Sequence, residues 1–240
     1  MANDAQRRAP LTPRRRACDE GRVTDASDLY FRQVAIGPMQ NFIYFIGSQR
    51  TRECVVVDPA WDSDAILEFA EQEGMRVKGA LVTHYHPDHV GGAMGAFRVP
   101  GGVAELCTKA GCHAHVNKHE AEGLLQITGM SESDLVRHES SDVLTFGDVA
   151  IELIHTPGHT PGSQCFLVRE RLVTGDTLFV DGCGRVDLPG GNGTQLRDSL
   201  RLLAKLPDST IVCPGHDYGR TPTNTIAEQK QSNFALIDVL

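Results

Sequence analysis

The stretch THYHPDHVGG, residues 83–92, places His84, His86, Asp88 and His89 within six positions. Imidazole nitrogens and carboxylate oxygens are the ligands that zinc, iron and manganese take in proteins. Residues i and i+2 of an extended segment point to the same side, so the first two histidines can face one point. The two glycines that close the stretch permit a tight backbone path. The pattern therefore predicts one half of a metal site.

Three more polar residues follow apolar segments later in the chain. His159 lies in the turn TPGHTPGS, Asp176 follows a predicted strand in TGDTLF, and His216 does the same in CPGHDYG. Layered α/β proteins place their ligand sites at the ends of strands. These three residues are therefore predicted to complete the metal site.

The elements that must position these residues can be predicted from periodicity and turn signals. Strands are expected over 30–36, 41–47, 54–59, 77–84, 113–117 and 210–216, with hairpins over 144–159 and 164–179 that turn at 147–148 and 169–171. Helices are expected over 62–74, 103–111, 194–207 and 223–240, the first capped by Asp62 or Ser63 and the third by Thr194. This mixed order predicts a sheet-rich α/β or α+β layered domain.

The composition limits the partners. Of the 240 residues, 40% are apolar and 22% charged, and the net charge is −8. An acidic chain lacks the basic surface that nucleic acids and anionic membranes bind, so neither partner is expected. No apolar run approaches the roughly 18–20 residues of a membrane span. Seven scattered cysteines indicate a reducing compartment, the cytoplasm, and a homodimer is compatible with the sequence.

The first 28 residues differ from the rest. They hold five arginines by position 16, two prolines and almost no apolar periodicity. We interpret residues 1–28 as a disordered basic tail and residues 29–240 as one domain. No apolar stretch follows the arginines, which disfavours a secretory signal, and Asp4, Asp19 and Glu20 disfavour a mitochondrial transit peptide.

THYHPDHVGG, TPGHTPGS, TGDTLF and CPGHDYG, in that order, resemble the motifs of the metallo-β-lactamase superfamily, and the resemblance runs from about residue 30 to residue 235. It implies a four-layer αβ/βα sandwich, in which two mixed β-sheets are flanked by helices and metals lie at one edge of the sheets. It also implies ligand sets. The first metal would take His84, His86 and His159, the second Asp88, His89 and His216, and Asp176 would bridge them.

The segment GCGRVDLPGGN, residues 182–192, is similar to a loop of glyoxalase II and the persulfide dioxygenases. That resemblance implies that Arg185 and Tyr218 help to hold glutathione, since a guanidinium can pair bidentately with a carboxylate. Pairing of Arg185 with Asp187 in its own loop is an equally weighted alternative. The 22 residues after Tyr218 (240 − 218) are too few for the helical glutathione-binding domain of glyoxalase II. Asp176 stands where the secreted β-lactamases have cysteine, which disfavours an antibiotic-degrading enzyme.

Two mechanisms fit these residues. In the favoured one, two divalent ions, zinc before iron, supply a hydroxide that attacks a glutathione thioester or an ester, and Asp88 orients the nucleophile. In the alternative, one Fe(II) on His84, His159 and Asp176 leaves positions open for O₂ and glutathione persulfide. The other candidate ligands would then be outer hydrogen-bonding residues. A lactonase-like hydrolase and a non-catalytic metal-binding protein are the remaining alternatives.

Overall fold

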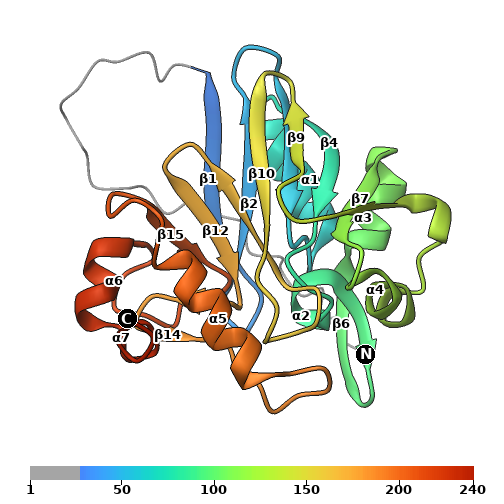
Figure 1. Ribbon diagram of the computed structural model, residues 1–240. Coiled ribbons are helices and arrows are strands. Elements are labelled where there is room, and N and C mark those ends of the chain that lie inside the picture. The colour runs from blue at the N-terminus through green and yellow to red at the C-terminus, as the bar shows by residue number, and fades with distance from the viewer. Residues whose placement is uncertain (1–27) are drawn as a thin grey trace, which may run out of the picture.

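Two six-stranded mixed sheets form the centre of the computed structural model, which describes residues 28–240 (Figure 1). The first sheet has the spatial order β1 (Leu29–Ile36), β2 (Asn41–Ser48), β3 (Glu53–Val57), β4 (Arg76–Leu81), β7 (His113–Asn117) and β8 (Leu135–His138). The second has the order β16 (Asn224–Thr225), β15 (Ile211–Pro214), β12 (Arg171–Gly175), β11 (Gln164–Val168), β10 (Val149–His155) and β9 (Val143–Phe146). Each sheet combines antiparallel hairpins with parallel pairs, such as β3 with β4 and β12 with β15.

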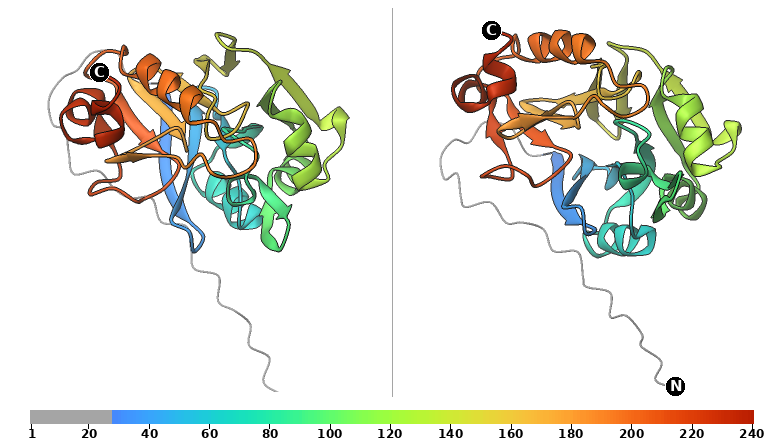
Figure 2. Two further views of the ribbon diagram at one scale, coloured as in Figure 1. Left: turned by 60° about the horizontal axis from the view of Figure 1, so that its bottom comes forward. Right: turned by 90° about the horizontal axis from the view of Figure 1, so that it is seen from below.

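Helices cover the outer face of each sheet. The first sheet carries α1 (Ser63–Gln72), α3 (Val103–Ala110) and α4 (Ala121–Thr128), and the second carries α5 (Gly193–Leu203), α6 (Ile226–Ser232) and α7 (Phe234–Ile237). The view from below shows the resulting order helix, sheet, sheet, helix (Figure 2, right). The chain therefore has the four-layer αβ/βα sandwich that the sequence resemblance implied.

Strand β2 illustrates why the chain layers in this way. All its residues are buried, and alternate side chains point to opposite faces of the sheet. Phe42, Tyr44 and Ile46 belong to the core between the two sheets. Ile43 and Phe45 belong to the core under the helices of the first sheet. A strand that is apolar on both faces needs a cover on each side, and the second sheet and the helices supply the two covers.

The predicted hairpins are confirmed, with Phe146 opposite Val149 in one and Val168 opposite Arg171 in the other. The Asp62 cap of α1 is also confirmed, because its carboxylate accepts a hydrogen bond from the Ala65 amide at 3.0 Å. The prediction of Thr194 as the cap of α5 is wrong. Asn192 caps this helix, since its side-chain oxygen reaches the amides of residues 194 and 195.

The helix predicted over 223–240 is two helices, α6 and α7, separated at Asn233. The side chain of Asn233 accepts from the Ala235 amide and so starts a new helix. Several short elements were not predicted: α2 (Pro87–Val90), the hairpin of β5 (Gly91–Met94) and β6 (Phe97–Gly102), the hairpin of β13 (Leu178–Phe179) and β14 (Gly182–Cys183), α4, β8 and a 3₁₀ turn over Glu132–Asp134.

The tail predicted over residues 1–28 falls, except for Asp28, outside the described residues. Within residues 28–240, no helix has the length and the apolar character that crossing a bilayer requires.

Candidate metal centre

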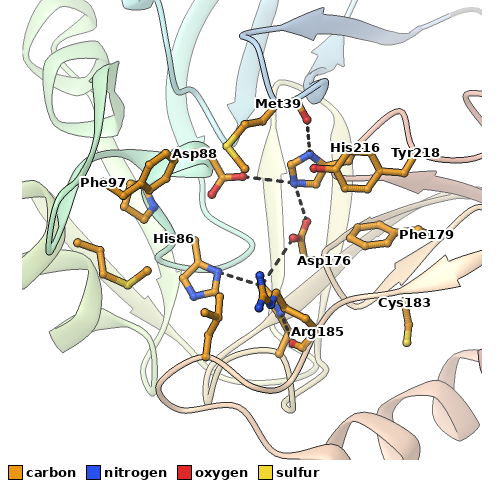
Figure 3. Close-up of a pocket in the computed structure, with 14 residues that line it drawn as sticks. Met39, His86, Asp88, Phe97, Asp176, Phe179, Cys183, Arg185, His216 and Tyr218 are labelled. Carbon is orange, nitrogen blue, oxygen red and sulfur yellow. Dashed lines mark hydrogen bonds and ion pairs between the residues drawn. The ribbon is translucent and has the colours of Figure 1, made fainter.

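The seven predicted ligands meet at one end of the two sheets, each just beyond a strand. His84 and His86 follow β4, and Asp88 and His89 lie in α2 directly after them. The second sheet supplies the remaining ligands from three places: His159 from the loop between β10 and β11, Asp176 after β12, and His216 after β15. All six other residues are buried, and the Asp176 side chain is 11% exposed. Figure 3 shows several of these side chains converging between the two sheets.

The first cluster consists of His84, His86 and His159, which offer one nitrogen each within 4.8 Å of one another. Nε2 of His159 lies 2.9 Å from Nδ1 of His86. Nε2 of His84 and Nε2 of His86 are buried and have no hydrogen-bond partner among residues 28–240. A buried polar atom without a partner is costly, by about 1–3 kcal/mol, unless something else binds it.

The second cluster consists of Asp88, His89 and His216, whose ligand atoms also lie within 4.8 Å of one another. Nε2 of His89 is 3.1 Å from Nε2 of His216. One carboxylate oxygen of Asp88, Oδ2, is 3.3 Å from each of these two nitrogens. The three groups thus surround a single point.

Asp176 lies between the two clusters. Its Oδ1 is 3.2 Å from Nε2 of His89, and its Oδ2 is 3.6 Å from Nε2 of His159. A side chain at Gly215 would overlap Oδ1 of Asp176, so the glycine is required for this approach. One carboxylate therefore faces both clusters, as a bridging ligand must.

The proton positions follow from the partners of the other ring nitrogens. Nδ1 of His159 donates to the carbonyl of Arg185 at 2.7 Å, and Nδ1 of His216 donates to the carbonyl of Met39 at 2.9 Å. Nδ1 of His89 donates to the Asp58 carboxylate at 3.0 Å. In neutral rings, these bonds leave every Nε2 as a lone pair.

Two of these lone pairs, on His89 and His216, face each other at 3.1 Å. Two lone pairs repel at this distance, so either a proton or a metal cation is favoured between them. A divalent metal is the cation that this donor set fits, because neutral imidazoles with carboxylates are the usual ligands of zinc and iron. Two observations therefore indicate a metal centre: the types of the donor groups, and the nitrogens of the first cluster that have no hydrogen-bond partner among the described residues.

The pKa values of the ligand residues also differ between the two clusters. Burial, aided by the neighbouring histidines, lowers the pKa of His84 well below its usual value and that of His86 to about 4, which keeps both rings neutral. Burial opposes a charge on His216 as well, but Asp176 and Asp88 outweigh it and raise its pKa to about 9. Both carboxylates have pKa values well below the usual range, because His89 and His216 outweigh their burial. The second cluster is therefore a place where a positive charge is favoured.

Two positioning residues, Asp58 and Asn41, were not predicted as part of the site. Asp58 accepts from the amide and the hydroxyl of Thr83 at 2.8 and 2.6 Å, in addition to His89. Asn41 donates to Asp88 at 3.1 Å and accepts from the indole of Trp61 at 3.0 Å. The position of Asp58 at the end of an apolar strand was a usable signal, whereas nothing local distinguishes Asn41.

Glu120 was missed too, and it connects two ligand-bearing loops. Its carboxylate is fully buried and accepts from the Tyr85 amide at 2.8 Å, the Thr160 hydroxyl at 2.7 Å and the Gly162 amide at 2.6 Å. Tyr85 separates the two histidines of the first loop, and Thr160 follows His159 in the other. Burial raises the pKa of Glu120 to about 7 against these three hydrogen bonds, which lower it.

A pocket of about 550 Å³ opens onto the ligands, and Arg185 and Tyr218 both line it. The guanidinium of Arg185 pairs bidentately with Asp187, at 2.7 and 2.6 Å, as one of the two sequence alternatives predicted. Tyr218 is 53% exposed and stacks on the ring of His216, with centroids 4.5 Å apart. A side chain at Gly184 would overlap the Asp176 carbonyl, so the GCGR loop needs glycine to approach the centre.

Comparison with known proteins places this centre in a family. The sequence profile of the metallo-beta-lactamase superfamily matches residues 36–216. The chain is 33% identical over 201 residues to the hydroxyacylglutathione hydrolase of Shewanella loihica, a match that covers 82% of this chain and 69% of that protein. It also resembles the crystal structure of ETHE1 from Myxococcus xanthus, with a TM-score of 0.73, 29% identity, and coverage of 88% of this chain and 89% of that one.

A third relative, TTHA1623, was solved in a di-iron-bound form. It has a TM-score of 0.68 and 28% identity, and the match covers 84% of this chain and 98% of that one. The profile match alone extends over well more than half of the 240 residues, and it contains all seven residues of the candidate centre. The chain therefore belongs to the metallo-β-lactamase superfamily.

Proposed function

We propose that this protein is a metal-dependent hydrolase that cleaves a thioester or an ester, with a glutathione thioester as the first substrate to test. The observation that carries the proposal is two three-residue donor clusters that share no residue, with Asp176 between them; a further donor group, Asp58, His84 and His89, overlaps both. A mononuclear enzyme needs one such cluster. Two complete clusters favour two ions, and zinc is our first choice for both.

When bound, the ions would lower the pKa of a water molecule to about 7 and polarise the carbonyl of the substrate. The chain's own residues would do the rest. Asp88 lines the pocket as well as the second cluster, so its carboxylate is placed to orient the nucleophile. Arg185 and Tyr218 are proposed to bind the thiol part of the substrate. The Arg185–Asp187 pair is exposed, so a substrate carboxylate can compete for the guanidinium.

The alternative is a mononuclear iron enzyme that oxidises glutathione persulfide. One feature of the centre favours it: His84 and His159 belong to one cluster, and a carboxylate oxygen of Asp176 lies 3.6 Å from Nε2 of His159, so these three residues offer a two-histidine, one-carboxylate set. Such a set is typical of non-haem Fe(II) oxygenases.

Metal analysis combined with two assays separates the alternatives. The hydrolase proposal expects close to two zinc ions per chain and hydrolysis of S-lactoylglutathione or another thioester without oxygen uptake. Close to one iron per chain, with oxygen consumed on glutathione persulfide, would overturn it. If neither substrate reacts, both enzyme proposals fail.

The ligand assignment has a separate test. We expect His84→Ala and Asp176→Ala each to reduce bound metal and to lower kcat/KM by at least about 100-fold, since each removes a ligand. His119→Ala is the control, because His119 is exposed and lies outside both clusters. Full metal content in His84→Ala would contradict the assignment.

We also propose a cytoplasmic location. No cysteine among residues 28–240 takes part in a disulfide, which agrees with a reducing compartment. The substrate would be a small molecule. The homodimer stays a prediction, to be tested by light scattering.

A further inference from the structure

We infer that the acyl group of the substrate is apolar and that it binds against Met39, Met94 and Phe97, which we call the apolar wall. The inference rests on the proposed thioesterase function and names the substrate class of the same site. All three residues line the pocket that opens onto the metal ligands.

The apolar wall is built from two separate segments. Met94 and Phe97 are cross-strand partners at the tip of the β5–β6 hairpin, so their side chains lie side by side on the hairpin. Met39 lies in the turn between β1 and β2, where its carbonyl accepts the Nδ1 hydrogen of His216. The wall therefore stands directly beside the ligand residues.

The side chain of Phe97 is largely accessible to solvent for an aromatic residue that lines a pocket. It is 39% exposed, although it is a large apolar residue at the mouth of a pocket. Apolar surface of this kind gains free energy when a ligand covers it, in proportion to the area removed from water. The flexible thioether side chains of the two methionines also adapt to ligands of varied shape.

The opposite side of the pocket is different. There Arg185 and Tyr218 offer a guanidinium and a phenol, although Phe179, Cys183 and Leu188 also line the pocket. Phe97 lies across the ligand residues from Phe179 and Tyr218 (Figure 3). A thioester has two arms that extend from its carbonyl. With that carbonyl at the metal centre, the polar thiol arm suits the side of Arg185, and the acyl arm is left to the apolar wall.

Lactoyl and other short hydroxyacyl groups fit this side poorly. Their hydroxyl lies one carbon from the carbonyl, beside the polar ligand residues, and they present only one methyl group or less to the two thioethers and the phenyl ring. Longer unsubstituted aliphatic or aryl acyl groups would remove more of this apolar surface from water.

The test is a chain-length series of acyl glutathione thioesters: acetyl, butyryl, hexanoyl and lactoyl. Each buried methylene is expected to raise kcat/KM roughly threefold, so hexanoyl, with four more methylenes, should exceed acetyl by about 80-fold. Phe97→Ala should flatten this dependence on chain length, because it removes the phenyl ring from the wall. Phe234→Ala is the control, because Phe234 is an exposed phenylalanine on α7 that does not line the pocket.

A binding measurement separates this inference from the proposed function. S-hexylglutathione and S-methylglutathione are thioethers that cannot be hydrolysed, and calorimetry gives their affinities directly. Tighter binding of the hexyl compound that Phe97→Ala abolishes supports the apolar wall, even if no thioester is cleaved. Hydrolysis with equal rates along the series, or with a preference for lactoyl, overturns the inference and leaves the hydrolase standing. Equal affinities for the two thioethers also overturn it.

Discussion

At the residue scale, the centre depends on which ring nitrogen carries the proton. Three of the five histidines of the centre are fixed through Nδ1, His159 and His216 by a backbone carbonyl and His89 by the Asp58 carboxylate. This leaves Nε2 directed into the site. Such outer partners orient a metal ligand and raise its basicity. Asp58 is the only charged residue among these three acceptors, so its removal should affect the metal most.

We expect Asp58→Asn to weaken metal binding about 10- to 100-fold, the usual effect of losing a carboxylate behind a ligating histidine. The backbone at Asp58 has a φ of 52°, a left-handed conformation that asparagine tolerates, so the change removes the charge with little strain. Competition with a chromogenic chelator measures the affinity. Asp148→Asn, on an exposed hairpin turn, is the control, and equal affinities in the two variants would contradict the prediction.

At the element scale, five of the candidate ligands lie in loops and two lie in the short helix α2, and other contacts must hold these segments in place. Glu120, next to the start of α4, does this for two of them with one carboxylate. The pairing of the strands brings their ends to one edge of the sheets. Contacts such as the hydrogen bonds of Glu120 then fix the loops that follow the strand ends.

Glu120→Ala should lower the free energy of unfolding by about 2 kcal/mol or more, because it leaves the Tyr85 and Gly162 amides without their acceptor, whereas the Thr160 hydroxyl keeps Ser163 as a partner. It should also weaken metal binding, since both ligand loops lose their common anchor. Urea denaturation and chelator competition measure the two effects. Glu122→Ala is the matched control on the same helix, since Glu122 is exposed and pairs only with Arg137 among the described contacts. If both variants behave alike, Glu120 is not an anchor.

A second prediction at this scale concerns a histidine pair on the parallel strands β7 and β8. Nδ1 of His115 lies 2.9 Å from Nε2 of His138, and burial lowers the pKa of His115 to about 4. The unfolded chain binds a proton at about pH 6.5, whereas the folded chain does so only near pH 4. Stability from this residue is therefore present above pH 6.5 and is lost as the pH falls toward 4, by on the order of 2 kcal/mol.

His115→Asn should make the free energy of unfolding fall less between about pH 7 and pH 4.5 than it does in the unaltered protein. Asparagine keeps a polar group near the position of Nδ1 but does not titrate. Urea midpoints at the two pH values give the comparison, and His119→Asn is the control, because His119 is exposed and is not among the groups that lower the pKa of His115. An unchanged acid sensitivity would show that His115 does not contribute.

At the scale of the whole molecule, the centre joins the two halves of the sandwich. The first sheet and α2 supply four of the ligands, and the loops of the second sheet supply the other three. Within the described chain the two halves share the core between the sheets, which Phe42, Tyr44, Phe166 and others fill. Bound metal would add a second connection at the edge, where Asp88 and Asp176 otherwise lie close to each other as like charges.

Removing the metal with a chelator should therefore lower the thermal midpoint by about 10 °C, which corresponds to metal at about 1,000 times its Kd. Calorimetry with and without EDTA measures the shift, and added zinc should reverse it. In Asp176→Ala the chelator should cause a much smaller change. A midpoint that does not respond to EDTA in the unaltered protein would argue against a tightly bound structural link.

Much of the fold could be predicted because its signals are local. Apolar alternation and turn residues predicted the hairpins of β1–β2, β9–β10 and β11–β12, and the Asp62 cap was visible as a residue type. The predicted cap of α5 was wrong because Asn192 and Thr194 are equally suitable residue types, and only the backbone path selects between them. The β5–β6 hairpin was missed because its glycine-rich strands carry no alternation, and their positions come from packing against α2 and α4.

The sequence by itself determined the chemistry of the centre, because ligand types and their spacing along a loop are covalent properties of the chain. It identified all seven candidate ligands and the two residues at the pocket mouth. Only the tertiary structure decided what surrounds them: that Asp58, Asn41 and Glu120 fix the ligand loops, that Arg185 pairs with Asp187, and that Met39, Met94 and Phe97 meet. These contacts join residues far apart in the chain, and their partners depend on which surfaces the hydrophobic layers bring together.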